Sequence, residues 1–377
     1  AFARVKLGEA QVSAMVARLR KQLDFAAGPG TGTQFDAATA FELYDKLLAP
    51  VSAAWRGKTQ LVVAAAGALS QLPLGILHTR PGGGFGGDAP WLIREASVAQ
   101  VPSLSAWIAI KAIAKARSAP QAFAGWGDPA FQTAAAAATR PTATRSVTLS
   151  RAATLADLDT LEKSGAAPAA LRYGDIPPLP DTREELLAIA NTLKASTASD
   201  VVLGSRATRA SVLAASQSGL LANKRVIAFA THGLMAGDLP NLNQPALALA
   251  ATGTEAQNPL APLLTLEDVL TLKLNADWVV LSACNTAAAD GKADEALSGL
   301  ARGFFYAGSR SLLVTHWAVE SESAKQLTTA TFEHYTANPQ APKAESLRQA
   351  MLKVMAKPGY SHPAYWAPYA LVGDGGR

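Results

Sequence analysis

Two side chains in this sequence could act together as a nucleophile and its base, and they are His232 and Cys284. A cysteine thiolate is a strong nucleophile, and histidine has the pKa that lets it exchange protons with a thiol near neutral pH. Cys284 is the only cysteine of the chain and follows His232 by 52 positions. The pair predicts a cysteine hydrolase, with the alternative that a lone cysteine is a small apolar core residue.

Both residues follow short apolar runs that we expect to be buried strands. The first run is RVIAFATHG (225–233) and the second is DWVVLSACNT (277–286). Uninterrupted apolar and β-branched residues are typical of parallel strands that are covered on both faces. Because reactive groups in open α/β sheets gather beyond the carboxyl ends of the strands, the histidine and the cysteine are predicted to lie at one edge. The N–H of Gly233 could then approach a developing oxyanion closely.

The surrounding patterns predict the elements that would hold these strands. Strand and helix signals alternate regularly through the second half, which indicates a parallel sheet with crossover helices. Thr182 and Glu185 have the spacing of a capping box at the start of one such helix. The first half opens with amphipathic helices within 9–25 and 41–48. We therefore predict an α/β fold with a mainly parallel sheet flanked by helices.

The composition indicates a globular protein and argues against a nucleic-acid-binding protein or a membrane-spanning one. The chain has 377 residues, of which 49% are hydrophobic and 17% charged, so it can bury a large core. Its net charge of +5 comes from scattered residues, which argues against nucleic-acid binding. No apolar run reaches the ~20 residues of a membrane span. One cysteine excludes an internal disulfide, so we expect a reducing, cytoplasmic location. The many alanines and few lysines suggest a bacterial source.

No cofactor or metal ion is predicted. The four other histidines, at positions 78, 316, 334 and 362, do not have metal-ligand spacing. The sequence Gly57-Lys58-Thr59 imitates the end of a P-loop, but the first glycine of that motif is missing and a strand pattern follows. His316 ends a predicted strand, where it could line a substrate cleft or simply pack, and packing is the commoner role.

The chain is expected to divide into two lobes. Residues from about 132 to 175 are poor in large apolar side chains and rich in Ala, Thr, Ser and Pro, as in an exposed connector. We place an N-terminal lobe at 1–175 and a C-terminal lobe at 176–377. The segment 133–146 is a candidate site of self-cleavage. The first residues lack a starting Met and a signal-peptide pattern, and we interpret the chain as part of a longer protein.

Four sequence blocks resemble, in order, those of CHAT domains: ATHG (230–233), LSACNT (281–286), LSGLARGFFYAGSRSLLVTHW (297–317) and YWAPYALVGDG (365–375). CHAT domains are similar to caspases, separase and gingipains and often follow tetratricopeptide repeats. The resemblance implies a caspase-like fold with an N-terminal pseudo-protease lobe. It also implies a cysteine endopeptidase with the dyad His232–Cys284, and an oxyanion hole formed by the amides of Gly233 and Cys284. The spacing of the pair agrees with that of caspases.

The same resemblance suggests where a substrate would be selected. Relatives have acidic residues after a tryptophan that follows the fifth strand, and here Trp317 is followed by Glu320 and Glu322. Carboxylates at this place would favour a basic residue before the scissile bond. Asp238 is a weaker candidate on a neighbouring loop. The equally weighted alternative is that the glutamates only begin a helix.

Taken together, these features predict limited, regulatory cleavage of a protein or peptide substrate. The resemblance implies control by an upstream domain, such as tetratricopeptide repeats, or by an activator protein. Two alternatives stay open on the sequence. The chain could be a non-catalytic scaffold of CHAT-like fold with an idle dyad, or an esterase or other acyl-transfer enzyme that uses the same residues.

Overall fold

The computed structural model describes residues 1–24, 34–113, 118–132, 173–239, 241–254, 258–282, 299–317 and 319–376. These residues cluster into two compact units. The first is formed by the described residues within 1–116 and 310–377, and the second by those within 117–286 and 298–309. The predicted lobe boundary near residue 175 stays a prediction, because residues 133–172 lie outside the described part.

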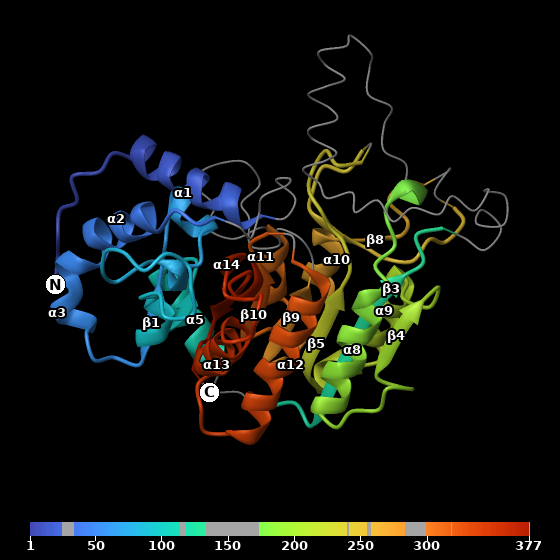
Figure 1. Ribbon diagram of the computed structural model, residues 1–377. Helices are drawn as coiled ribbons and strands as arrows, with labels where there is room; N and C mark the ends of the chain where they lie inside the picture. The colour runs from blue at the N-terminus through green and yellow to red at the C-terminus, as the bar shows by residue number, and fades with distance from the viewer. Residues whose placement is uncertain are drawn as a thin grey trace, which may run out of the picture. The chain divides into compact units, whose positions relative to one another are not determined.

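The first unit joins the two ends of the chain (Figure 1). Its strands lie in the order β1-β2-β11-β10, and only the β10–β11 pair is antiparallel. The strands are β1 Gln60–Val63, β2 Ser97–Gln100, β10 Ser311–Thr315 and β11 Tyr369–Gly373. The helices are α1 Glu9–Leu23, α2 Ala37–Leu47, α3 Ser52–Trp55, α4 Leu92–Glu95, α5 Leu104–Ile113, α12 Ser321–Ala337, α13 Lys343–Met355 and α14 Pro363–Trp366.

The second unit has four parallel strands in the order β9-β5-β3-β4 and a small antiparallel sheet, β6-β7-β8. The strands are β3 Gln121–Pro129, β4 Val201–Gly204, β5 Lys224–Ala230, β6 Gly233–Leu234, β7 Ala246–Ala248, β8 Leu263–Thr265 and β9 Trp278–Ser282. The helices are α8 Asp181–Thr192, α9 Arg209–Gln217, α10 Leu266–Thr271 and α11 Gly299–Tyr306. The predicted α/β fold with mainly parallel strands is confirmed.

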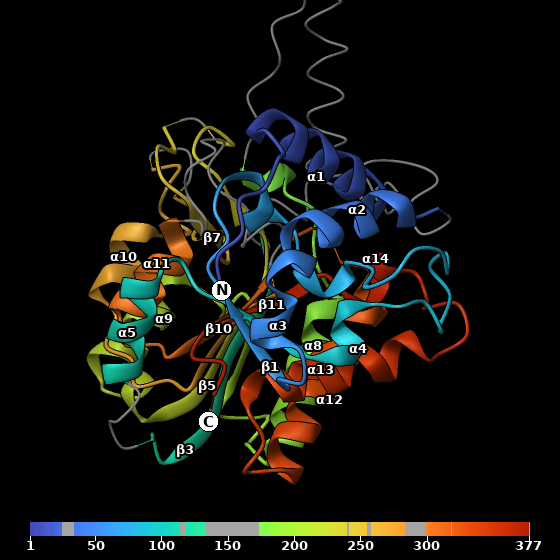
Figure 2. The same ribbon diagram turned by 90° about the vertical axis from the view of Figure 1, so that its left-hand side faces the viewer.

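Both faces of the parallel strands in the second unit are covered by helices, as their continuous apolar sequences require. Figure 2 shows α9, α10 and α11 grouped on one side of these strands, with α8 on the other. On the first side, Trp126 of β3 stacks on Phe229 of β5, which in turn contacts Phe304 of α11. On the α8 side, β3 presents glycines instead. A Cβ built on Gly127 would lie 2.5 Å from Leu186 of α8, so the missing side chain lets this helix approach the strand closely.

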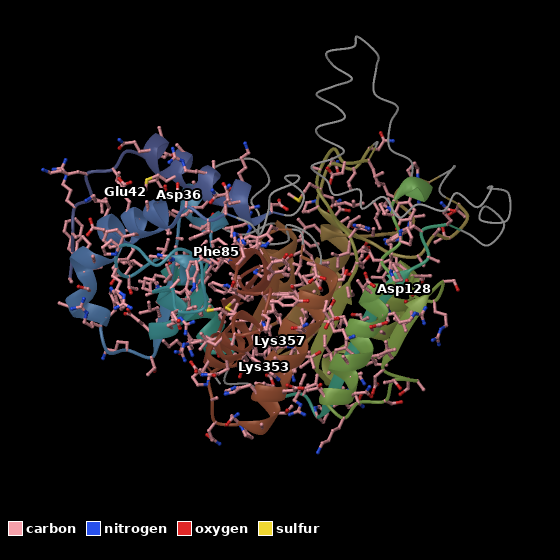
Figure 3. The ribbon with its side chains drawn as sticks, viewed as in Figure 1. Asp36, Glu42, Phe85, Asp128, Lys353 and Lys357 are labelled. Carbon is pink, nitrogen blue, oxygen red and sulfur yellow. The ribbon has the colours of Figure 1, made fainter. Side chains whose placement is uncertain are left out.

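The helix α8 corrects one sequence-based expectation. It begins at Asp181 with Pro180 as its N-cap, and no side chain caps it. The predicted capping box of Thr182 and Glu185 is therefore wrong. The Thr182 hydroxyl instead donates to the Leu179 carbonyl and accepts the N–H of Asp128, at the end of β3. Arg183 pairs at 2.6 Å with the carboxylate of Asp128, which is labelled in Figure 3. This ion pair joins the start of α8 to the carboxyl end of β3.

No helix within the described ranges combines the length and the apolar character needed to cross a bilayer.

Candidate functional site

His232 lies where β5 leaves the parallel strands and the chain enters the small sheet at β6. The preceding residue, Thr231, makes hydrogen bonds to a strand of each sheet. The N–H of Thr231 donates to the Ser282 carbonyl of β9 at 3.3 Å, and its hydroxyl donates to the Ala248 carbonyl. The carbonyl of His232 itself accepts the N–H of Ala248 at 3.0 Å. The histidine backbone is thus held by two sheets, which is the preorganisation that a catalytic group needs.

The imidazole ring of His232 has a defined tautomer. Its Nε2 lies 2.9 Å from the carbonyl oxygen of Pro177. Because a carbonyl only accepts hydrogen bonds, Nε2 must carry a proton, and the lone pair of the neutral ring is left on Nδ1. The ring also packs against Phe131, with 5.5 Å between ring centroids. Burial lowers the pKa of His232 below its usual value, while the Pro177 carbonyl opposes that shift. The neutral ring can therefore accept a proton at Nδ1.

The backbone amide of Gly233 points away from the small sheet. Gly233 is paired with Leu247 in the antiparallel β6–β7 ladder, and the neighbouring hydrogen bond runs from the Ala248 N–H to the His232 carbonyl. This pattern makes Gly233–Leu247 a non-hydrogen-bonded pair, in which both N–H groups face outward. The Gly233 N–H is therefore not used by β7, as an oxyanion donor requires.

The strands that precede His232 and Cys284 are neighbours in register. β5 and β9 are parallel, and Ala230 is paired with Ser282. His232 and Cys284 each come two residues after these partners. Neighbouring strands are about 4.8 Å apart, so Ala230 and Ser282 lie side by side. Cys284 itself lies outside the described residues, and its role stays a prediction.

A buried carboxyl group, expected from its sequence spacing to belong to a capping box, lies instead at the end of the cysteine strand. Glu185 of α8 is 3% exposed, and its Oε2 accepts the hydroxyl hydrogen of Ser282 at 3.0 Å. A signal for this was present in the sequence. Glu185 stands four residues before Ile189 on the apolar stripe of the helix, where a charged residue needs a partner.

Asp238, the weaker substrate-binding candidate, belongs to the turn after β6. Its carboxylate accepts the N–H of Met235 at 2.7 Å, which closes that turn. No group of three His, Cys, Asp or Glu side chains in the described part of the chain could hold a metal ion.

The other predicted substrate-binding residues belong to the first unit, after β10. Trp317 is fully buried, and its indole N–H donates to the Ala364 carbonyl at 3.2 Å. The guanidinium of Arg20, on α1, lies 6.0 Å from the centre of its ring. The buried indole therefore offers no exposed surface to a peptide in this conformation. Its place in a substrate pocket stays a prediction.

The two glutamates differ in their local roles. Glu320 is the N-cap of α12, and its carboxylate accepts the N–H groups of Glu322 and Ser323, at 3.0 and 2.8 Å, and the Ser323 hydroxyl. Glu322 is about half exposed and lies 3.9 Å from Lys325. The capping geometry fits the helix-start alternative for Glu320, and the predicted preference for a basic residue continues to rest on the sequence.

Replacing Glu320 with alanine should therefore lower the free energy of unfolding by about 1 kcal/mol, because the first turn of α12 loses its cap. Urea unfolding of the wild type, Glu320→Ala and Glu322→Ala would measure this. Glu322→Ala is the matched control and should change stability by less than about 0.5 kcal/mol, because it removes only solvent-exposed contacts with Lys325 and Gln326. Equal effects of the two substitutions would contradict a capping role for Glu320.

Comparison with known proteins agrees with the sequence blocks around this site. Residues 37–374 match the family described as CHAT domain. The chain belongs to the CHAT domain family. The match covers both units and includes His232 and Cys284. The predicted family membership is thus confirmed, while the roles of the individual residues are not tested by it.

Individual relatives of this CHAT domain are distant. It is 28% identical over 223 residues to the mouse protein "Tetratricopeptide repeat protein 28", which covers 52% of the chain but only 9% of the mouse protein. Among solved structures, the Arg-specific cysteine proteinase gingipain R aligns with all of this chain and 79% of its own, at 10% identity and a TM-score of 0.46. The Saccharomyces cerevisiae separase–securin complex aligns with 76% of this chain and 14% of its own, at 12% identity and a TM-score of 0.36.

Proposed function

We propose that this CHAT domain is a caspase-like cysteine endopeptidase with His232 and Cys284 as its dyad. The observation that carries the proposal is the β5–β9 register together with the hydrogen bond from His232 Nε2 to the Pro177 carbonyl. The register pairs Ala230 with Ser282, and these residues stand two positions before His232 and Cys284 in the sequence. The hydrogen bond leaves Nδ1 as the basic nitrogen. A nucleophile and an oriented base at the carboxyl edge of a parallel sheet constitute an acyl-transfer site.

In the proposed reaction, His232 Nδ1 takes the proton of the Cys284 thiol, and the thiolate attacks the scissile carbonyl carbon. The carbonyl π electrons move to oxygen, and the N–H groups of Gly233 and Cys284 stabilise the resulting oxyanion. The intermediate then collapses, the C–N bond breaks, and the imidazolium protonates the leaving amine. A water molecule, deprotonated by His232, hydrolyses the thioester and regenerates the thiol.

The substrate in this proposal is a protein segment bound in an extended conformation, so that backbone pairing gives affinity and a pocket gives specificity. A basic residue before the scissile bond is the preference expected from Glu320 and Glu322. Cleavage would be limited and controlled by another domain or an activator. A relative named for tetratricopeptide repeats, of which this chain spans 9%, supports control from elsewhere in a longer protein.

The proposal is tested by adding the wild type or the Cys284→Ala variant to a bacterial lysate and identifying the new protein N-termini. We expect cuts that only the wild type makes, and arginine or lysine before most of them. Cuts after other residues would overturn the basic-pocket assignment alone. Identical N-termini with both proteins, also when the longer parent protein is used, would favour the non-catalytic scaffold.

A further inference from the structure

The contact between Glu185 and Ser282 connects a helix to the strand that leads to Cys284. Glu185 projects from α8, which the glycines of β3 allow to lie close to the strands. Its buried carboxyl group accepts the Ser282 hydroxyl at 3.0 Å, and Ser282 is the last residue of β9. Cys284 follows two residues later. A side chain from a separate element thus holds the last residue of the strand that precedes Cys284.

The same serine also contacts the histidine strand. The Ser282 carbonyl accepts the N–H of Thr231, the residue immediately before His232. One residue therefore receives a helix contact through its side chain and a contact from the histidine segment through its backbone. A shift of Ser282 would therefore displace the end of β9, which precedes Cys284, and Thr231, which precedes His232.

We propose that Glu185 is a positioning residue for the dyad, which it keeps in register by holding Ser282. This inference rests on the proposed function. Glu185 acts on the reaction through Ser282 and not through the substrate. Misplacement of a reacting group by about 1 Å can cost about 100-fold in rate, so one buried contact is enough to matter.

The direction in which the pKa of the Cys284 thiol shifts when Glu185 is replaced distinguishes a positioning role from a direct charge effect. If Glu185 holds Cys284 near His232, its loss separates the thiol from the imidazole, and the pKa of the thiol should rise toward the ordinary value of about 8.5. If the carboxylate influenced the thiol only through its negative charge, its removal would stabilise the thiolate and lower that pKa. The two explanations thus predict opposite shifts.

The experiment measures the rate of Cys284 alkylation by iodoacetamide against pH, with intact mass as the readout. Because Cys284 is the only cysteine, each added group reports on it. We expect a wild-type midpoint below that of a free thiol, a rise of about one pH unit in Glu185→Ala, and near wild-type behaviour in Glu185→Gln, whose amide oxygen can still accept the serine hydroxyl. Glu184→Ala, which removes an exposed carboxylate from the preceding position, is the matched control and should leave the midpoint unchanged.

Ser282→Ala removes the other half of the contact with the loss of one hydroxyl, and it should reproduce the rise seen in Glu185→Ala. The double variant should rise no further, because both changes remove one interaction. Where a cleaved peptide is known, kcat should fall about 10- to 100-fold with little change in KM. Thermal unfolding checks that each variant is folded.

A wild-type midpoint below 8.5 that neither Glu185→Ala nor Ser282→Ala raises would overturn the positioning role while leaving the dyad intact. A drop in the midpoint would overturn it in favour of the charge effect. A wild-type midpoint at about 8.5 together with no cleavage would overturn the proposed function, and with it the need for positioning.

Discussion

The Cys284→Ala variant should lose peptide cleavage by a factor of at least about 10⁴ while keeping the fold of the wild type, because the nucleophile is removed and nothing replaces it. His232→Ala should cost about 10²- to 10⁴-fold, since a general base and acid is lost. The double variant should be no slower than Cys284→Ala, because two residues that act as one unit do not contribute separately. The rates are measured on a peptide that carries a cut site from the lysate experiment.

The pH dependence of the wild type adds a test of the histidine's role. Burial lowers the pKa of His232 below its usual 6.5. Below the lowered pKa the ring is protonated and cannot accept the thiol proton, so kcat/KM should fall with decreasing pH only below about 6.5. Full activity in either single variant, or an acid limb well above pH 7 in the wild type, would contradict the dyad. Thermal unfolding is the control for the fold.

The strands of this site could be predicted from the sequence because their apolar character is continuous. The runs before His232 and Cys284 are too uniformly apolar to be amphipathic helices or half-exposed strands. The strands β5 and β9 occupy the expected positions. Alternating strands and helices predicted a parallel sheet, but the adjacency of β5 and β9 is known only from the structure. His232 follows the end of β5 as predicted, whereas the predicted position of Cys284 lies outside the described residues.

The groups that orient these residues could not be predicted in the same way. The partner of the His232 ring is a backbone carbonyl, that of Pro177, and a carbonyl is present at every position of a chain. Glu185 was assigned to a capping box because local spacing matched one, yet its partner Ser282 is 97 residues away. The short strand β7 belongs to a separate antiparallel sheet and not to the predicted parallel one, because its pairing with β6 and β8 depends on chain reversals that local patterns do not encode.

His316 shows how a buried polar residue can control the stability of the first unit. The ring is fully buried after β10, and within the described residues neither ring nitrogen has a hydrogen-bond partner. Burial, assisted by the nearby positive charge of Arg20, lowers the pKa of His316 from 6.5 to about 3. Of the two roles considered from the sequence, this geometry supports packing, because a fully buried ring has no surface to offer a substrate.

This pKa shift makes acid conditions unfavourable for the fold. Between pH 6.5 and about 3 the unfolded chain binds a proton at His316 and the folded chain does not, so stability falls as the pH falls. The expected loss is about 1.4 kcal/mol per pH unit, or roughly 5 kcal/mol over the window, and it vanishes above pH 6.5. The His316→Leu variant has no group to titrate at this position and should lack this part of the slope.

Urea unfolding of the wild type and His316→Leu at several pH values from 8 to 4 measures the difference. Protonation of carboxylates and of other buried histidines contributes equally to both proteins, so the informative quantity is the gap between the two curves. Leucine fills a similar volume without polar atoms, and at pH 8 the two proteins should differ by less than about 1.5 kcal/mol. Below pH 6.5, the free energy of unfolding of the variant should rise relative to that of the wild type with every pH unit. Parallel curves would show that the folded protein protonates His316 as readily as the unfolded chain does, and that the ring is not held in a dry, neutral environment.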